Sequence, residues 1–238
     1  MKKNFEFEGL QLKKHRWILL ISAFLSQLSS LYFFTIIGRV DSTEANGVLK
    51  NYITLSGLAS TISMCILVVY GTVIINRFLV TNYISENKTR LYVYPIGRSR
   101  LFYTKIASFC GVFSLFQFLG IAVSNAIYLV IETFTPILLT SESASKYFIP
   151  FMITALASVM LTISIIILSS LVGIYFNSTV TTIVTGIIFV VIFGNILAMA
   201  FASNVVITLG ASILVALVTS IFIKITGMRI ENDEVISK

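Results

Sequence analysis

The residues best suited to chemistry in this chain gather in one segment, 86–105, which reads ENKTRLYVYPIGRSRLFYTK. It carries one acidic and five basic side chains around a single proline. A residue before proline disfavours the helical region, so Tyr94 should be extended, whereas Pro95 suits the first position of a new helix. We therefore expect a short helix or turn near 84–93, a break at Tyr94–Pro95, and then a second helix. Such a rigid, kinked segment suits a mechanical contact with another protein.

Residue patterns that perform catalysis or bind metals are missing. The chain has no H-E-x-x-H, no G-x-S-x-G and no G-x-x-x-x-G-K-(S/T) phosphate loop. Its single histidine, His15, stands in the basic string KKHRW, with no second metal ligand nearby. We expect no catalytic residue, metal site or cofactor in this chain. We therefore predict that it is not an enzyme. Energy for any transport must come from another chain.

Long apolar runs must position these residues. The 238 residues are 57% hydrophobic and 11% charged, whereas soluble domains have about 25% charged residues. Runs of about 20 apolar residues cross the hydrocarbon core as helices. Such runs cover 17–37, 53–75, 104–131, 148–171, 180–202 and 205–226. The sequence thus predicts an all-α, polytopic membrane protein with six transmembrane helices in a single domain, 1–238.

Lys and Arg are distributed unevenly around these spans. Fourteen of the 17 basic residues fall on one side, with five in 1–16, six in 76–105 and three in 224–238. Basic residues near span ends stay cytoplasmic, so we predict a plasma-membrane protein with both termini in the cytoplasm. The net charge of +7 follows from this bias and faces anionic lipid. No soluble basic surface remains for nucleic acid.

Away from their ends, the predicted spans have only amides and hydroxyls as polar groups, because every Asp, Glu, Lys and Arg falls at a span end or in a loop. The proton or sodium relays of ion-coupled carriers are therefore not expected. Four amides either hydrogen-bond between helices or line a polar substrate path: Gln27, Gln117, Asn125 and Asn195. Small residues at fourfold spacing either pack helices within the chain or form a seam for a second copy: Ser22/Ser26/Ser30, Thr154/Ser158/Thr162 and Ser212/Ala216/Ser220.

One part of the chain is similar to a known family. The string YPIGRSRLFYTKI resembles the pattern P-I-(S/G)-R-x-x-L-x-x-x-K-(L/I), which follows the second span in permeases of type-2 ABC transporters. The preceding ENKT resembles the E-x-K-(T/G) of small Gram-positive members. The N-terminal LQLKKHRWILL is similar to the amphipathic interfacial helix that opens those permeases. Six spans with both ends inside match the same architecture, so the resemblance covers the whole chain.

The resemblance implies a cytoplasmic coupling helix between spans two and three, which docks on an ATP-binding subunit. On this chain the coupling helix would be Ser85–Tyr94, and Pro95 its pivot. The implied contacts with the ATPase are Glu86, Lys88, Thr89, Arg90, Leu91, Val93 and Pro95. The implied interfacial anchors are Arg98, Arg100, Lys105, Lys13, Lys14 and Arg16. The implied partners are two ATPase subunits, which carry ATP and Mg, and a second permease chain, alike or different.

Small permeases of this kind resemble those of antimicrobial-peptide (lantibiotic) immunity and bacitracin-type exporters. The resemblance therefore implies export of an amphipathic peptide, or of a lipid-like or drug molecule. The short outside loops, 38–52 and 132–147, and the turn near Ser203–Asn204 leave no room for a lid or receptor domain, so substrate would be taken from the membrane or its surface. One alternative is a substrate-binding membrane subunit of an importer, which would lack the P-I-x-R register. The other is a membrane-embedded enzyme or structural protein.

The basic asymmetry generates a topology prediction. Single cysteines introduced at Asp41 and at Glu142 should react with a membrane-impermeant maleimide in intact cells, and one at Lys88 should react only after permeabilisation. Cys65 and Cys110 are first replaced by serine. Labelling of position 88 in intact cells would contradict the six-span topology.

Overall fold

The computed structural model describes residues 12–40, 51–84, 97–137, 144–203 and 205–232. Over these ranges it contains helices and no strand, which confirms the all-α class. The long helices are α2 (Lys13–Val40), α3 (Tyr52–Phe78), α5 (Arg98–Phe134), α6 (Phe148–Tyr175), α7 (Thr179–Ser203) and α8 (Val205–Glu231). Two short 3-10 helices, η2 (Val80–Tyr83) and η3 (Ala144–Tyr147), follow α3 and precede α6.

Five of the described helices, α2, α3, α5, α6 and α8, are long and apolar enough to cross a membrane. In α7 the apolar stretch is the shorter Thr179–Gly194, so a sixth crossing stays a prediction. Each predicted span lies inside one helix, and the third helix begins well before its predicted span, at Arg98. Large apolar side chains are exposed along the outer faces. Hydrocarbon rather than water is the solvent that suits such a surface.

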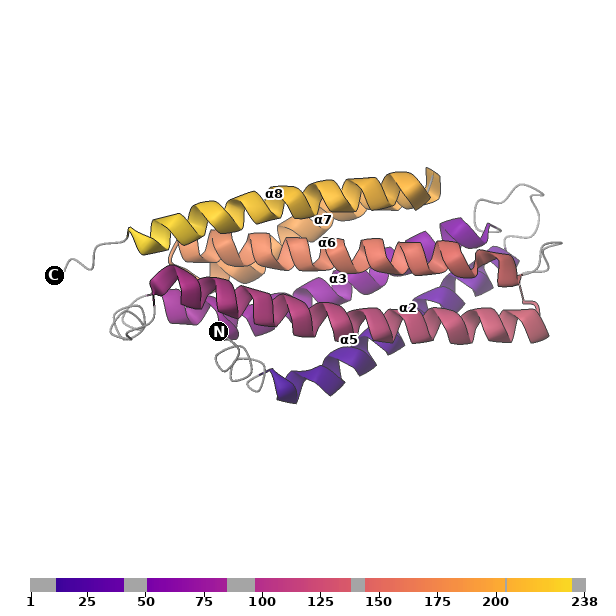
Figure 1. The fold of residues 1–238 in the computed structure, drawn as a ribbon. Coiled ribbons are helices and arrows are strands. Elements are labelled where there is room, and N and C mark those ends of the chain that lie inside the picture. Colours follow the sequence, from indigo (N-terminus) through magenta and orange to yellow (C-terminus); the bar gives the residue numbers. More distant parts are fainter. Residues whose placement is uncertain (1–11, 41–50, 85–96, 138–143, 204, 233–238) are drawn as a thin grey trace.

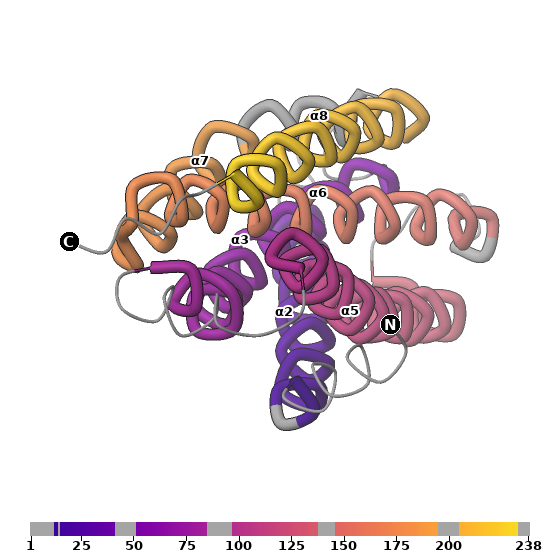
Figure 2. The backbone as a smooth tube through the Cα atoms, turned by 60° about the vertical axis from the view of Figure 1, so that its left-hand side comes forward, coloured from indigo at the N-terminus to yellow at the C-terminus, as the bar shows by residue number. Residues whose placement is uncertain are grey.

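The helices run back and forth along one direction, with α3 and α6 in the middle of the bundle (Figure 1). Helix α2 crosses α3 and α5 on one side, while α7 and α8 cover α3 and α6 on the other (Figure 2). The starts of α2 and α5 and the ends of α3 and α8 therefore lie toward the same end of the bundle (Figure 1). We call this the basic end, because most described Lys and Arg residues belong to these four helix termini.

Local sequence explains where two of the helices begin and end. The Asn51 side chain accepts a hydrogen bond from the backbone N–H of Ile53 at 3.0 Å, which caps the start of α3. Helix α6 ends in a Schellman motif: Asn177 has φ +50°, and the next amide, of Ser178, donates to Gly173 O at 3.0 Å. The Ser178 hydroxyl accepts in turn from Thr181 N at 3.3 Å. Three residues thus reverse the chain between α6 and α7.

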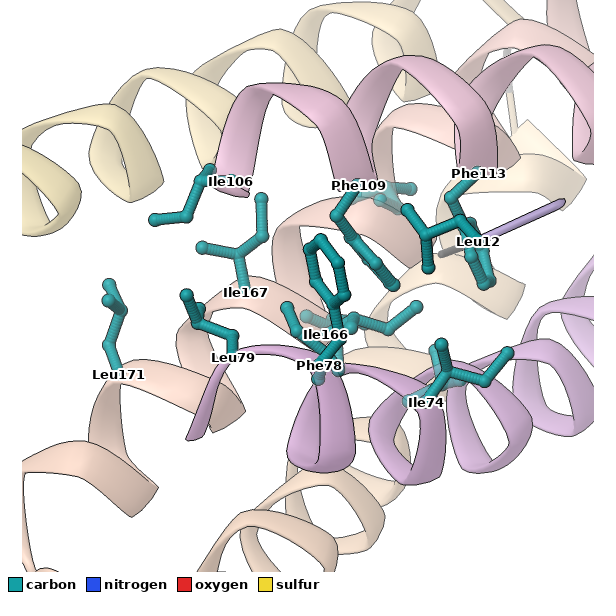
Figure 3. Close-up of a cluster of buried hydrophobic side chains, with 14 of the residues drawn as sticks. Leu12, Ile74, Phe78, Leu79, Ile106, Phe109, Phe113, Ile166, Ile167 and Leu171 are labelled. Carbon is teal, nitrogen blue, oxygen red and sulfur yellow. The ribbon is translucent and has the colours of Figure 1, made fainter. Parts of the chain in front are cut away.

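Near the basic end, α3, α5 and α6 meet in the largest apolar cluster (Figure 3). Ile74 and Phe78 enter it from α3, Phe109 and Phe113 from α5, and Ile166 from α6. The rings of Phe109 and Phe113 stack with centroids 5.2 Å apart. In a membrane such contacts stabilise through close van der Waals packing, because lipid is as apolar as the cluster itself.

The crossing of α2 and α5 requires a glycine. A Cβ placed on Gly120 would lie 2.7 Å from Ala23 Cβ and 2.8 Å from the backbone oxygen of Leu20. One turn later, the Ser124 hydroxyl donates to Phe24 O at 3.2 Å. The two backbones approach this closely only because residue 120 has no side chain.

We predict that Gly120→Ala separates α2 from α5 and lowers the free energy of unfolding by about 1–3 kcal/mol, as overpacking does in other cores. The measurement is the melting temperature of the purified chain in detergent. Gly210→Ala is the matched control, because nothing lies within 4 Å of a Cβ at that position of α8. Its stability should be unchanged or slightly higher, since alanine favours helix. Equal melting temperatures for wild type and Gly120→Ala would contradict the tight crossing.

Candidate functional site

A hydrogen-bonded cluster of fully buried polar side chains joins four helices in the bundle. The Gln27 amide nitrogen donates to Asn125 Oδ1 at 3.0 Å and to Ser60 Oγ at 3.3 Å. The Ser63 hydroxyl donates to Gln27 Oε1 at 2.7 Å. The Asn125 amide nitrogen donates to Phe151 O at 3.2 Å, which brings in α6. We call Gln27, Ser60, Ser63 and Asn125 the polar core; none of the four side chains is exposed.

A second amide lies between α5 and α6. Gln117 is fully buried and donates from Nε2 to Thr162 Oγ1 at 2.9 Å, and the Thr162 hydroxyl donates to Ser158 O at 2.7 Å. Gln117 Oε1 has no hydrogen-bond partner. For Gln27, Gln117 and Asn125 this geometry favours helix packing over a substrate path. The side chain of Asn195 lies outside the described residues.

The three stripes of small residues differ in how deeply they are buried. Ser26 and Ser30 are buried on α2, and Thr154, Ser158 and Thr162 are fully buried on α6, so these two stripes pack helices within the chain. On α8 the stripe is buried at one end and exposed at the other, because Ser212 is buried and Ser220 is exposed. A seam for a second copy on α8 stays a prediction.

At the end of the bundle away from the basic end, the structure buries an acid that the sequence did not single out. Glu132 is 2% exposed, and its Oε1 accepts from Tyr52 OH at 3.3 Å and from Ile137 N at 3.0 Å. Nearby, the hydroxyls of Tyr128 and Thr35 are 2.8 Å apart. The predicted third span ended one residue earlier, at 131, so Glu132 was placed in a loop. Its partner Tyr52 comes from α3, which no local pattern around Glu132 reveals.

At the basic end, Lys105 joins the start of α5 to the end of α3. Its side chain is 6% exposed, and Nζ donates to Phe78 O at 3.4 Å and lies 5.0 Å from the Phe78 ring centroid. Phe78 O also accepts from Asn82 Nδ2 at 2.7 Å. The ammonium group adds a cation at the negative end of the helix dipole. Lys105 was expected as an anchor in lipid headgroups. The structure instead places its ammonium group against protein.

The other expected anchors differ in exposure. Lys13 and Arg100 are exposed, whereas Arg16 and Arg98 are half-buried. The side chain of Lys14 is outside the described part of the chain. The amphipathic interfacial helix was expected at LQLKKHRWILL, residues 10–20. Residues 10 and 11 lie outside the described residues, and Lys13–Arg16 form the first turn of α2 without a break.

Aromatic contacts join the helix termini on either side of the expected coupling helix. Tyr83 of η2 packs edge-on against Phe102 of α5, with ring centroids 5.5 Å apart. The neighbouring Tyr103 hydroxyl donates to Lys224 O of α8 at 3.5 Å, and a side chain on Gly227 would collide with that ring. Arg229 lies over the Tyr175 ring of α6 at 4.5 Å. The start of α5 thus contacts the ends of both α3 and α8.

The predicted ATPase contacts, Glu86 to Pro95, lie outside the described residues, so their arrangement stays a prediction. No cluster of three or more His, Cys, Asp or Glu that could hold a metal occurs in the described ranges.

Comparisons with models of known protein families, with curated proteins and with solved structures find no match to this chain. The resemblance of segment 86–105 to ABC permeases therefore rests on the residues of that segment alone.

We predict that Gln27→Ala and Asn125→Ala each lower the free energy of unfolding by about 1–2 kcal/mol, because each leaves buried partners without a hydrogen bond. In a double-mutant cycle the two losses should add to more than the loss in the double variant, by about 0.6–1.7 kcal/mol. Detergent-based unfolding titrations measure both quantities.

The control for this cycle is Gln27→Ala combined with Ser29→Ala, since the Ser29 hydroxyl is exposed and donates only to Ser26 O of its own helix. Those two changes should be additive. Additive losses for Gln27 and Asn125, or no loss at all, would reopen the interpretation of these amides as a substrate path.

Proposed function

We propose that this chain is the membrane-spanning permease subunit of an ATP-driven ABC exporter. A separate ATPase docks on segment 85–94, and the substrate is an amphipathic peptide of the lantibiotic type or a lipid-like molecule. The proposal rests on the register of Pro95, Arg98, Leu101 and Lys105 after the second apolar helix. The missing phosphate loop supports an ATPase on another chain.

The observation that carries the proposal is the position of Lys105, the last basic residue of that register. Its ammonium group caps α3 although it belongs to α5. The ends of α3 and α5 that flank segment 85–96 are thereby held together, and Tyr83 and Phe102 add a second contact. A force applied to the segment then acts on both helices at once. A merely topogenic basic loop needs no buried lysine at this position.

Contacts at the start of α5 would transmit a movement of segment 85–94 to other helices. Tyr103 contacts α8 at Lys224 and Gly227, and the α3–α5–α6 apolar cluster begins within one turn. The polar core farther along the bundle ties α2, α3, α5 and α6 into one unit. We infer that α3 and α5 move with segment 85–94 and that α8, the most exposed of these three helices, shifts against them.

The substrate path in this proposal runs along the membrane-facing surface. The amides of the polar core hydrogen-bond between helices. The exposed surface of α8 is mostly apolar, apart from Ser220 and, near its end, Lys224, Arg229 and Glu231. An amphipathic molecule already dissolved in the membrane suits such a surface. A second permease chain, alike or different, would complete the path.

We predict that exchanging the charges in segment 85–94, Glu86→Lys with Lys88→Glu, reduces co-purification of the proposed ATPase partner at least ten-fold. The exchange replaces attractive contacts by repulsive ones, which cost several kcal/mol at interfaces. Membrane levels should stay normal, because no apolar span changes. Co-purification is measured by quantitative blotting from membranes in which both proteins are expressed.

The matched control is the same exchange at the opposite end, Glu142→Lys with Lys146→Glu, which should leave co-purification unchanged. Lys105→Met tests transmission: the ATPase should still bind, but release of a labelled amphipathic antimicrobial peptide from cell membranes should fall. Full ATPase binding and full peptide release in all variants would leave 85–105 as a topogenic loop and would overturn the proposed function.

A further inference from the structure

The charges of α2 fix where this helix crosses a bilayer. Residues 17–38 carry no charge and are bounded by Arg16 and Arg39. At 1.5 Å per residue they span about 33 Å, little more than the roughly 30 Å of a hydrocarbon core. Lys13 and Arg39 are exposed at the two ends of the helix, and exposed charges are costly in hydrocarbon. The first turn of α2 therefore lies at the membrane boundary nearer the basic end, which we call the inner boundary.

This first turn is not level with the helix ends around it. His15 Nδ1 is 3.4 Å from the Tyr70 hydroxyl, eight residues before α3 ends. The Arg16 guanidinium lies 5.9 Å from the ring centroid of Phe116, 18 residues after α5 begins. The first turn of α2 is thus about 12 Å from the end of α3 and about 27 Å from the start of α5, measured along those helices. Figure 1 shows that α2 begins well inside the bundle.

On the opposite side of the bundle, the apolar surface reaches the helix ends. Asn76 Nδ2 donates to Thr179 O at 3.1 Å, so α7 begins level with the end of α3. No charged residue occurs between Lys146 and Lys224, which includes the α6–α7 turn at 176–178. Phe176 and Val180 at this turn are 64% and 66% exposed, and the exposed apolar face of α7 continues with Val184, Ile187, Ile188 and Val191. Exposed aromatic and aliphatic side chains at an uncharged turn are typical of the border between hydrocarbon and headgroups.

The two sides therefore mark the inner boundary at different levels of the bundle. A Cβ placed on Gly186 of α7 would lie 2.6 Å from Thr72 Cγ2 of α3, two residues from the Tyr70 that meets His15. The first turn of α2 is thus level with Gly186, about 15 Å farther along the bundle than Phe176. A boundary perpendicular to the bundle would put either the charges of α2 in hydrocarbon or the α6–α7 turn in water.

We propose that the bilayer crosses this bundle obliquely, with its inner boundary running from the α6–α7 turn on one side to the first turn of α2 on the other. Figure 2 shows α2 and α7 on opposite sides of α3. At the outer end the turn between α7 and α8 stops short of the end of α5 (Figure 1), as the same tilt requires.

The exposed face of α5, which lies beside α2, changes character at the level that this boundary predicts. Up to residue 111 its exposed residues are Arg100, Tyr103, Ala107 and Gly111. From residue 115 to 131 they are all large and aliphatic: Leu115, Leu119, Val123, Ile127, Val130 and Ile131. The change occurs within one turn of Phe116, which meets α2. The start of α5 thus stands outside the hydrocarbon, whereas α7 is covered by lipid from its first turn.

This inference stands apart from the proposed function, because it uses neither segment 85–94 nor an ATPase. Its test is the depth of a tryptophan in the bilayer. Trp17 is the only tryptophan of the chain and is 69% exposed on the first turns of α2. Phe176→Trp and Ile187→Trp are each made in a Trp17→Phe chain. All chains are reconstituted in phosphatidylcholine vesicles that carry bromine either near the headgroup or near the end of an acyl chain.

Bromine quenches tryptophan only at short range, so the ratio of the two quenching efficiencies reports depth. We expect Trp17 and the Phe176→Trp variant to be quenched more by the shallow bromine. We expect the Ile187→Trp variant to be quenched more by the deep bromine, because residue 187 lies about 16 Å along α7 from residue 176, close to the bilayer midplane. Ile188→Trp, at the neighbouring exposed position, repeats the deep measurement.

Ile187 is the matched position, because it is level with the first turn of α2 along the bundle but lies on the other side. Equal depths for Trp17 and for the Ile187→Trp and Ile188→Trp variants would mean that the boundary is perpendicular to the bundle, and would overturn the proposal. So would a Phe176→Trp variant that neither brominated lipid quenches, since water or another protein would then cover the α6–α7 turn.

Discussion

The hydrogen bonds of Gln27 with Asn125, Ser60 and Ser63 are the interaction on which the arrangement of α2, α3, α5 and α6 depends. Hydrocarbon offers no hydrogen-bond partner, so a polar side chain inside a membrane bundle must find its partner in the protein. Gln27 uses both its nitrogen and its oxygen to do so, and Asn125 continues the network to a backbone oxygen of α6. Apolar contacts can slide past one another at little cost, but these bonds select one rotation of each helix.

The close contacts around this network follow from the same constraint. Once α2 and α5 are brought together by Gln27 and Asn125, the backbones cross where Gly120 meets Ala23. The α6–α7 turn meets the same need for internal hydrogen-bond partners. Asn177 in the left-handed region allows the last carbonyls of α6 to be satisfied within three residues. The ends of the bundle show the same rule with charges: Lys105 is buried where it meets a helix C-terminus, and Glu132 where it meets an amide and a tyrosine hydroxyl.

A bundle built in this way has a hydrogen-bonded centre, whereas its basic end is held by apolar packing with a few polar contacts. The centre holds four helices through several hydrogen bonds. At the basic end, the apolar cluster packs α3, α5 and α6 together, one lysine and a pair of aromatic rings add contacts between α3 and α5, and Tyr103 contacts α8.

The sequence by itself determined the helical class, the position of each long helix, the asymmetry of Lys and Arg, and the lack of catalytic motifs, because hydropathy, length and charge are local properties. The sequence located the amides of the polar core but did not decide whether they pack helices together or line a substrate path. Only the tertiary structure decided that Gln27 bonds Asn125, 98 residues away, and that Lys105 faces a carbonyl of α3 rather than lipid. It likewise buried Glu132, whose partner Tyr52 lies 80 residues away. The physical reason is that many Ser, Thr and amide side chains in these helices are equally able to pair, and the choice among them depends on the rotation and crossing of whole helices, which no local pattern encodes.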